Sequence, residues 1–436
     1  MTRNDRDNIN QRTENRHLLR RMKAGLAAVR TTPYKGALAA VYLLGAMLVW
    51  LFRGRLFALD TYGMFSPVLE AVINLLLPLY AVGGLLALLV LLGTPWGGRA
   101  AREGLQKVGL VNHAGEAPVL LSKRPDTDNP RLTVWEFDPC GIPLNEWEDK
   151  QARIETALDI TIAKMAWAEG QKIIRVHAAP AASELPSLLR WQDKYLSPES
   201  FVLVLGESLL GPVTVNLANI PHILLGGSTG SGKSVLLKLL LMQAFHKGAE
   251  VYIADFKGGV DFPKVWHKKC RMCFNEQDLL YTLNQLVAVL EYRKGRLAET
   301  GCKDLDAYNE ATGDGLPRLV FACDEVAEML DRTGRSKEDK ELLAQIESRL
   351  ATLARLGRAF GIHLILATQR PDANVIPGQI KNNLDFRVCG RADDTLSSII
   401  LGNNSADDQI PKDARGRFIL QDGTVFQGYL FDEGRL

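Results

Sequence analysis

The chain has 436 residues, 47% of them hydrophobic and 23% charged, a length for two or three folded domains and a composition that excludes a disordered or fibrous protein. Its formal net charge is only +2, which excludes a protein that attracts nucleic acid through overall charge. Any contact with DNA must therefore come from local patches.

The chain begins with a basic segment, residues 1–35. Nine Arg or Lys residues stand there against three acidic ones, and nine minus three leaves +6. Two apolar stretches follow, residues 36–52 and 71–93. Both reach the length that crosses about 30 Å of hydrocarbon, the first only just. They are core helices or membrane spans, and Trp50, Tyr80 and Trp96 near their ends favour spans.

A cleaved signal peptide does not fit the first stretch, because it ends in Trp50, Leu51 and Phe52 where small residues would precede a cleavage site. Orientation follows from basic residues. The basic segment and Arg99 lie on the two outer flanks, whereas segment 53–70 is nearly balanced in charge. We expect a protein of the cell membrane with two spans, and with both termini in the cytoplasm.

We therefore expect four parts: a basic cytoplasmic tail (1–35), two transmembrane helices with a short outside loop (36–96), a linker with a small α+β subdomain (97–200), and a motor domain (201–436). In the third part, residues 132–137, 172–177 and 201–205 are predicted strands, and 146–167 a predicted helix. Gly97-Gly98 and 124–131 resemble linker and turn. No chemistry is assigned to this subdomain.

The strongest motif is a P-loop between two apolar runs, 223–225 and 235–242. Its residues are Gly227, Ser228, Thr229, Gly230, Ser231, Gly232, Lys233 and Ser234. In a strand–turn–helix setting, successive backbone N–H groups surround phosphates. Lys233 would then reach the β- and γ-phosphates of ATP, and the Ser234 hydroxyl would bind Mg²⁺. The alternative is a chance Gly/Ser-rich turn before a helix.

From residue 221 onward, short apolar strands alternate with helices. The predicted strands are 222–225, 250–254, 318–323, 363–367 and 386–389, and the predicted helices are 233–247, 276–299, 339–359 and 392–401. This alternation predicts an α/β domain whose mostly parallel sheet is covered on both faces. Ligands bind such sheets at the carboxyl ends of the strands.

Acidic and amide side chains follow these strands. Asp324 and Glu325 come after strand 318–323, as in a Walker B motif, with Asp324 as the Mg²⁺ partner and Glu325 as the general base. A chance Asp-Glu pair at a helix start is the alternative. The run Thr368-Gln369-Arg370-Pro371 follows strand 363–367 and places a hydroxyl and the amide of Gln369 beside the expected γ-phosphate, where such a group can sense it. Asp255 follows strand 250–254.

Together these motifs resemble the FtsK/SpoIIIE family of DNA-translocating ATPases. The residues that carry the resemblance are 221–235, 324–329, 357–371 and 378–387, and it extends over roughly 200–430. It implies a RecA-like P-loop motor that assembles as a ring, usually a homo-hexamer, around DNA. It also implies that Gln369 senses the γ-phosphate and that an arginine acts in trans; the candidates left open are Arg355, Arg358, Arg387 and Arg391.

DNA contact is expected from two basic loops, because a motor that tracks DNA without reading it contacts phosphates. The first holds Lys257 and Lys264, and the second Arg332, Arg335 and Lys337. For the second loop, a solvated charged surface is an equal alternative.

The short chain resembles the coupling ATPases of Gram-positive conjugative elements, of the TcpA and ConQ type. Little sequence follows the predicted last strands, so we expect no orientation-reading winged-helix module. This resemblance predicts a DNA pump for a transfer channel, with a relaxase or channel proteins as partners. Two alternatives stay open: a chromosome or septum translocase, and a motor of the type VII secretion group. A scaffold that binds ATP without turnover is disfavoured, because Lys233, Ser234, Asp324 and Glu325 are all present.

Overall fold

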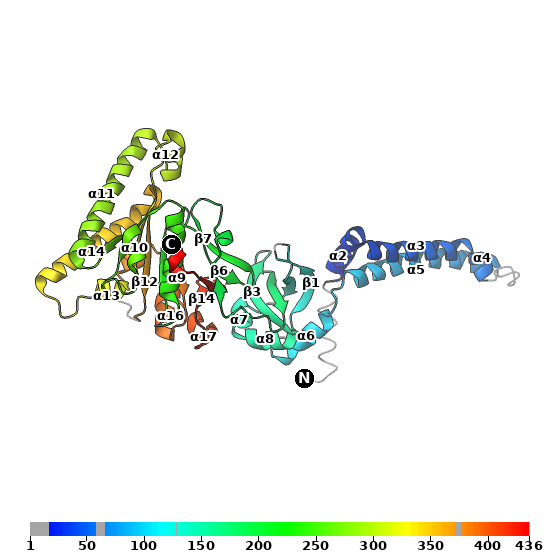
Figure 1. Ribbon diagram of the computed structural model, residues 1–436. Helices are drawn as coiled ribbons and strands as arrows, with labels where there is room; N and C mark the ends of the chain where they lie inside the picture. The colour runs from blue at the N-terminus through cyan, green and yellow to red at the C-terminus, as the bar shows by residue number, and fades with distance from the viewer. Residues whose placement is uncertain (1–16, 58–65, 128, 371–375, 436) are drawn as a thin grey trace. The chain divides into compact units, whose positions relative to one another are not determined.

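The computed structural model describes residues 17–57, 66–127, 129–370 and 376–435 (Figure 1). It divides into two compact units, Met1–Ser183 and Glu184–Leu436. The second unit begins before the expected boundary at 200, because strand β5 (Leu189–Arg190) pairs with β15 (Val425–Leu430) near the end of the chain. Most of the basic tail, residues 1–16, and Pro371 lie outside the described residues.

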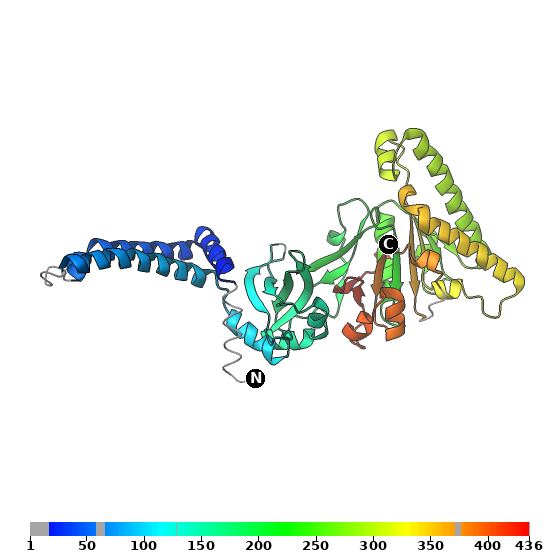
Figure 2. The same cartoon turned by 180° about the vertical axis from the view of Figure 1, so that it is seen from behind.

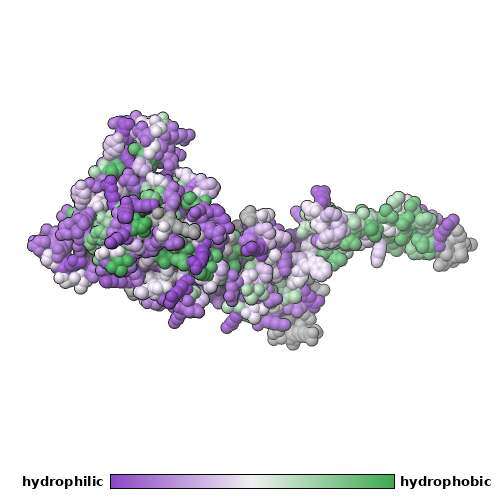
Figure 3. Space-filling view, in the orientation of Figure 1, coloured by the Kyte–Doolittle hydropathy of each residue, from purple (hydrophilic) through white to green (hydrophobic). Residues whose placement is uncertain are grey.

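The N-terminal part of the first unit is helical. Its helices are α2 (Leu18–Thr31), α3 (Pro33–Leu51), α4 (Arg53–Leu56) and α5 (Ser66–Gly93). Helices α3 and α5 run side by side (Figures 1 and 2), and the Tyr42 hydroxyl donates to the Ala81 carbonyl, 2.9 Å away. Both are long and apolar enough to cross a membrane, by length and composition, and Figure 3 shows their surface as hydrophobic.

The rest of the first unit is a four-stranded antiparallel sheet with three helices. The strands are β1 (Val119–Pro125), β2 (Thr133–Asp138), β3 (Ile160–Ala168) and β4 (Ile173–Pro180), in the order β1-β2-β4-β3. The helices are α6 (Gly98–Lys107), α7 (Leu144–Asp149) and α8 (Gln151–Leu158). Their shared core holds Leu105, Phe137, Trp147 and Ile174, all buried.

One expectation for this part is wrong. The predicted helix 146–167 ends at Leu158, because Asp159 adopts a left-handed conformation (φ 53°), and the β-branched Ile160-Thr161-Ile162 that follow form the start of β3. The predicted turn 124–131 is present between β1 and β2, although β1 extends to Pro125. Gly97 lies in the turn between α5 and α6, with a φ of 79°, and Gly98 is the first residue of α6.

The second unit contains one large mixed sheet. Its strand order is β10-β9-β11-β12-β8-β13-β14-β15-β6-β7. The first six strands of that order pair in parallel: β10 (Arg271–Cys273), β9 (Glu250–Ala254), β11 (Leu319–Cys323), β12 (Ile362–Thr368), β8 (His222–Gly226) and β13 (Phe386–Cys389). The last four, β14 (Arg417–Leu420), β15, β6 (Val202–Ser208) and β7 (Gly211–Asn216), continue it antiparallel.

Helices cover both faces of this sheet. On one face, α9 (Lys233–His246) and α10 (Lys264–Lys269) bury Leu237, Leu240 and Trp266 against the strands. On the other lie α11 (Glu276–Thr300), α14 (Lys337–Leu356) and α16 (Asp394–Leu401), with α12 (Leu305–Thr312), α13 (Val326–Met329), α15 (Gly378–Lys381) and α17 (Ser405–Gln409). Figures 1 and 2 show α11 and α14 side by side.

The predicted α/β class is confirmed. All five predicted strands are present within about two residues of their expected ends, as are the four helices, the third of which passes into a short 3₁₀ helix, Gly357–Phe360. The parallel strands bring their carboxyl ends to one edge, which places the segments after β8, β9, β11 and β12 together.

Candidate functional site

The P-loop lies between β8 and α9, as the sequence predicts. Gly227, Gly230 and Gly232 all have positive φ values (150°, 77° and 100°), a conformation that L side chains rarely adopt. A Cβ on Gly227 would lie 2.6 Å from the Ser231 hydroxyl oxygen. Helix α9 begins at Lys233, so its first N–H groups face the loop that would hold phosphates.

Lys233, Ser234 and Asp324 form one hydrogen-bonded cluster. The Lys233 Nζ lies 2.7 Å from Asp324 Oδ1 and 2.5 Å from its carbonyl oxygen, and the Ser234 hydroxyl lies 2.9 Å from both carboxylate oxygens. Lys233 and Asp324 are each only 3% exposed. The loop and the residue after β11, ninety residues apart in the sequence, are thus one site.

The chemistry of these donors fits a magnesium nucleotide. Phosphates can replace Asp324 as the partner of Lys233, and Mg²⁺ can replace Lys233 as the partner of Asp324, so each ion pair is exchanged rather than lost. The Ser234 hydroxyl, already against both carboxylate oxygens, is placed to be the second protein ligand. When bound, the metal would neutralise charge on the phosphates.

Glu325 and Gln369 lie together beside this cluster. The Thr368 hydroxyl donates to Glu325 Oε1 at 2.8 Å, and the Gln369 amide N–H donates to Oε2 at 3.0 Å. The Gln369 side-chain oxygen accepts from the Thr229 hydroxyl at 2.8 Å. The predicted base and the predicted sensor are therefore in contact, and the sensor touches the P-loop. Thr368 is the last residue of β12, and its hydroxyl was predicted to lie beside the γ-phosphate; its contact with Glu325 was not predicted.

The four candidate arginines occupy different places. Arg391 lies in cis at the P-loop, where Nη2 donates to the Thr229 carbonyl at 2.7 Å and its own carbonyl accepts from Ser228 N–H at 2.7 Å. Arg387 donates to the carbonyls of Lys381 and Leu384. Arg355 and Arg358 are exposed and precede β12, at the sheet edge opposite the P-loop of their own chain. Only these two are both exposed and remote from it.

Most of the candidate DNA-binding residues are paired with acids. Lys257 lies 2.7 Å from Asp261, Arg332 2.5 Å from Glu347, Arg335 3.1 Å from Glu276, and Lys337 4.0 Å from Glu341. Lys264 is exposed at the start of α10. These pairs are partly solvent-exposed and therefore weak, so phosphates can compete for the cations.

Asp255 belongs to the same edge of the sheet, although no role was predicted for it. It is 3% exposed, and its Oδ1 accepts from the Lys257 N–H at 3.0 Å. Burial raises the pKa of Asp255, and the nearby carboxylates of Asp261 and Asp324 raise it further. The pKa of Lys257 is raised by its contact with Asp261 and by Asp324 and Glu325.

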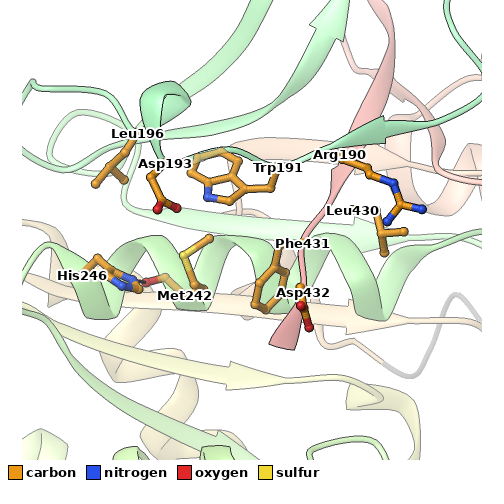
Figure 4. Close-up of a pocket in the computed structure, with 9 residues that line it drawn as sticks. All are labelled: Arg190, Trp191, Asp193, Leu196, Met242, His246, Leu430, Phe431 and Asp432. Carbon is orange, nitrogen blue, oxygen red and sulfur yellow. Dashed lines mark hydrogen bonds between the residues drawn. The ribbon is translucent and has the colours of Figure 1, made fainter. Parts of the chain in front are cut away.

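A separate cavity of about 620 Å³ lies far along α9 from the P-loop (Figure 4). Met242 and His246, from the last turns of α9, form one wall, and Trp191 and Phe431 form the other. Because the P-loop is at the opposite end of the helix, this cavity is not the nucleotide site. Among the described residues, no three His, Cys, Asp or Glu side chains form a metal cluster, Cys270 and Cys273 included.

The fold and this site define a P-loop domain in which the loop after β8, the acid pair after β11 and Gln369 after β12 meet at the ends of neighbouring parallel strands. The profile of the FtsK/SpoIIIE family matches residues 194–373. The structure of the pCW3 conjugation coupling protein TcpA, a monomer form with ATPγS, is 34% identical, and the match covers 78% of this chain and 96% of that one with a TM-score of 0.58. The chain belongs to the FtsK/SpoIIIE family of P-loop ATPases.

Curated relatives are longer proteins. DNA translocase FtsK of Helicobacter pylori (strain J99) is 28% identical over 299 residues, which are 64% of this chain and 34% of that protein. DNA translocase SftA of Bacillus subtilis is 29% identical over 281 residues, 60% of this chain and 28% of that protein. The chain thus spans about a third of the length of these relatives.

Proposed function

We propose that this chain is a membrane-anchored, ATP-driven DNA translocase that acts as the coupling protein of a conjugative element. The observation that carries the proposal is the match with the coupling protein TcpA over 96% of that chain. Two helices of membrane-spanning length precede the motor, and the nucleotide-site residues form one cluster.

The roles follow from the contacts. Lys233 would bind the β- and γ-phosphates, and Ser234 and Asp324 would hold Mg²⁺. Glu325, positioned by Thr368 and Gln369, would accept the proton of the attacking water. Because Gln369 contacts Thr229 through its side chain and Glu325 through its backbone N–H, a change at the γ-phosphate would reach the base through one residue.

We propose that hydrolysis takes place between subunits of a ring. Arg355 and Arg358 are the best candidates for the trans-acting cation, since they are exposed and lie away from the P-loop of their own chain. DNA contact would come from the loops that hold Lys257, Lys264, Arg332, Arg335 and Lys337, which follow the strands at the site edge. Both termini and the motor would face the cytoplasm.

The direct test is ATP hydrolysis by the full chain in lipid nanodiscs, with and without duplex or single-stranded DNA. We expect DNA to stimulate hydrolysis, and Lys233→Ala to abolish it, a loss of at least about 100-fold, because the phosphates lose their cation. Lys238→Ala is the matched control, since Lys238 lies on the same helix but pairs with Glu433. An absence of stimulation by either DNA contradicts the proposal.

A second candidate function, a chromosome translocase, is favoured by the similarity to the DNA translocases FtsK and SftA. The two candidate functions predict that different cellular processes stop when the nucleotide site is inactivated. In the native host, Lys233→Ala should abolish conjugative transfer and leave chromosome segregation normal. The opposite result supports the second candidate.

A further inference from the structure

Asp255 lies beside Asp324 on the face of the sheet that carries the P-loop helix. Strands β9 and β11 are parallel neighbours, with Ala254 opposite Cys323. Ala254 and Cys323 belong to the core under α11 and α14. Side chains alternate along a strand, so the next residues of the two strands, Asp255 and Asp324, both face α9. Asp324 confirms this direction through its contacts with Lys233 and Ser234.

One carboxylate oxygen of Asp255 is buried without a hydrogen-bond donor. Oδ1 accepts from the Lys257 N–H, whereas Oδ2 has no partner among the described residues. Buried carboxylate oxygens in proteins normally have donors or a cation, because burial removes their water. Asp261, six residues on, is by contrast paired with Lys257. The carboxylate of Asp261 has a cation as its partner, whereas Oδ2 of Asp255 is buried with no partner among the described residues. A missing ligand would explain this difference.

The burial of Asp255 is shared with the groups that act on the nucleotide. Lys233 and Asp324 are also 3% exposed, and the Ser231 hydroxyl of the P-loop is likewise buried without a partner among the described residues. All four lie at the same edge of the sheet. Asp255 is therefore buried in the same place as the residues of the nucleotide site, where Lys233 is bonded to Asp324.

We infer that Asp255 is a second acidic residue of the magnesium site, whose Oδ2 accepts a hydrogen bond from a water in the metal's shell. The inference rests on the proposed use of magnesium ATP. Mg²⁺ keeps several of its waters when proteins bind it, and those waters need acceptors. Asp324 would hold the metal, and Asp255, which follows the neighbouring strand, would accept a hydrogen bond from one of its waters. Asp255 would orient water and act as a positioning residue.

The test compares Asp255→Asn with wild type in the full chain in nanodiscs. Asn keeps the acceptor for the Lys257 N–H but removes the charge at the second oxygen. We measure Mn²⁺ binding by electron paramagnetic resonance with ATPγS present, and ATPγS binding in excess EDTA. We expect the Mn²⁺ dissociation constant to rise about five- to tenfold, because a charged acceptor for the metal's water is lost, and metal-free nucleotide binding to change less than twofold.

Asp261→Asn is the control, because it removes a carboxylate from the same loop that already has a lysine partner. It should bind Mn²⁺ as wild type does. The inference is overturned if Asp255→Asn and wild type bind Mn²⁺ equally, or if Asp255→Asn weakens metal-free nucleotide binding as much as metal binding. Should Asp255→Asn not fold, Asp255→Ser, which keeps a hydroxyl acceptor, is measured in its place against the same two criteria.

These readouts separate the inference from the proposed function. Metal binding is measured without hydrolysis and without DNA, so a chain that shows the Asp255 effect but no DNA-stimulated hydrolysis keeps the inference and loses the translocase proposal. A chain that hydrolyses ATP with DNA stimulation, and is unchanged by Asp255→Asn, keeps the proposal and loses the inference.

Discussion

Strands β8, β11 and β12 carry polar residues at both ends, and the two ends differ in what those residues bind. At the carboxyl ends, Lys233, Asp324 and Glu325 bond to groups of the same site. At the amino ends, His222 Nδ1 accepts from the Leu364 N–H at 2.9 Å, and His363 Nδ1 lies 3.1 Å from the Pro221 carbonyl. The residues at the carboxyl ends can exchange their partners for a ligand. The two histidines at the amino ends instead bond to backbone groups of the neighbouring strand or its flank.

The amino-end cluster is also tied to an ion pair. Arg318 donates to His363 Nε2 at 3.1 Å and to both carboxylate oxygens of Asp306 at 2.6 Å. Burial lowers the pKa of His222 to about 4. Burial lowers the pKa of His363 as well, and the nearby Arg318 lowers it further. Both rings are neutral at pH 7, so burying them requires no buried charge. The comparison predicts that changes at this edge affect stability and changes at the other affect catalysis.

The largest expected effect is on catalysis, in Glu325→Gln. Hydrolysis of ATP should fall by about 100- to 1000-fold, because the amide cannot accept a proton, while ATP binding stays close to wild type. Steady-state hydrolysis and binding of a fluorescent ATP analogue measure the two. Glu328→Gln, in the helix that follows, is the control and should hydrolyse ATP normally. If Glu325→Gln still hydrolyses ATP at a rate within threefold of wild type, Glu325 is not the general base.

The next effect is on stability, in Arg318→Met. The free energy of unfolding should fall by about 1–3 kcal/mol, because the charged hydrogen bonds to Asp306 and His363 are lost. Nucleotide affinity below the melting temperature should not change. Chemical denaturation of the full chain in detergent measures the first and nucleotide titration the second. Arg349→Met, whose side chain bonds Asn284 near the surface, should be milder. If folded Arg318→Met binds nucleotide more weakly than wild type, the prediction that residues at the amino ends of the strands affect only stability is wrong.

The third expected effect is a dependence of stability on pH. A histidine whose folded pKa is below its unfolded value of 6.5 destabilises the fold as pH falls, because the unfolded chain binds the proton more readily. Stability should be constant above pH 6.5 and fall toward pH 4, by about 1.4 kcal/mol per pH unit for each such histidine. Denaturation at pH 7 and pH 5.5 measures this loss.

His222→Asn should reduce that loss, since Asn keeps an acceptor for the Leu364 N–H but does not titrate in this range. His113→Asn, at an exposed position, should keep the wild-type dependence. Equal losses in wild type and His222→Asn would show that carboxylates, and not this histidine, cause the acid sensitivity.

The sequence predicted the nucleotide end of the sheet in detail. The P-loop glycines, the acid pair after β11 and Gln369 after β12 are local signals, because each chemistry needs particular residues just after a strand. It failed at residues 159–167, where a helix was predicted and β3 forms, because the pairing of β3 with β4 outweighs a mixed local pattern. It also offered Arg391 for a trans role, although the fold places it in cis at Thr229.

By itself, then, the sequence determined the class of the P-loop domain, the two membrane-length helices and the residue types of the nucleotide site, since those depend on neighbours in the chain. Only the tertiary structure decided which distant groups meet: Lys233 with Asp324, Glu325 with Thr368 and Gln369, and Asp255 beside Asp324. Strand order sets those meetings, and strand order results from packing of the whole sheet, which no local pattern encodes.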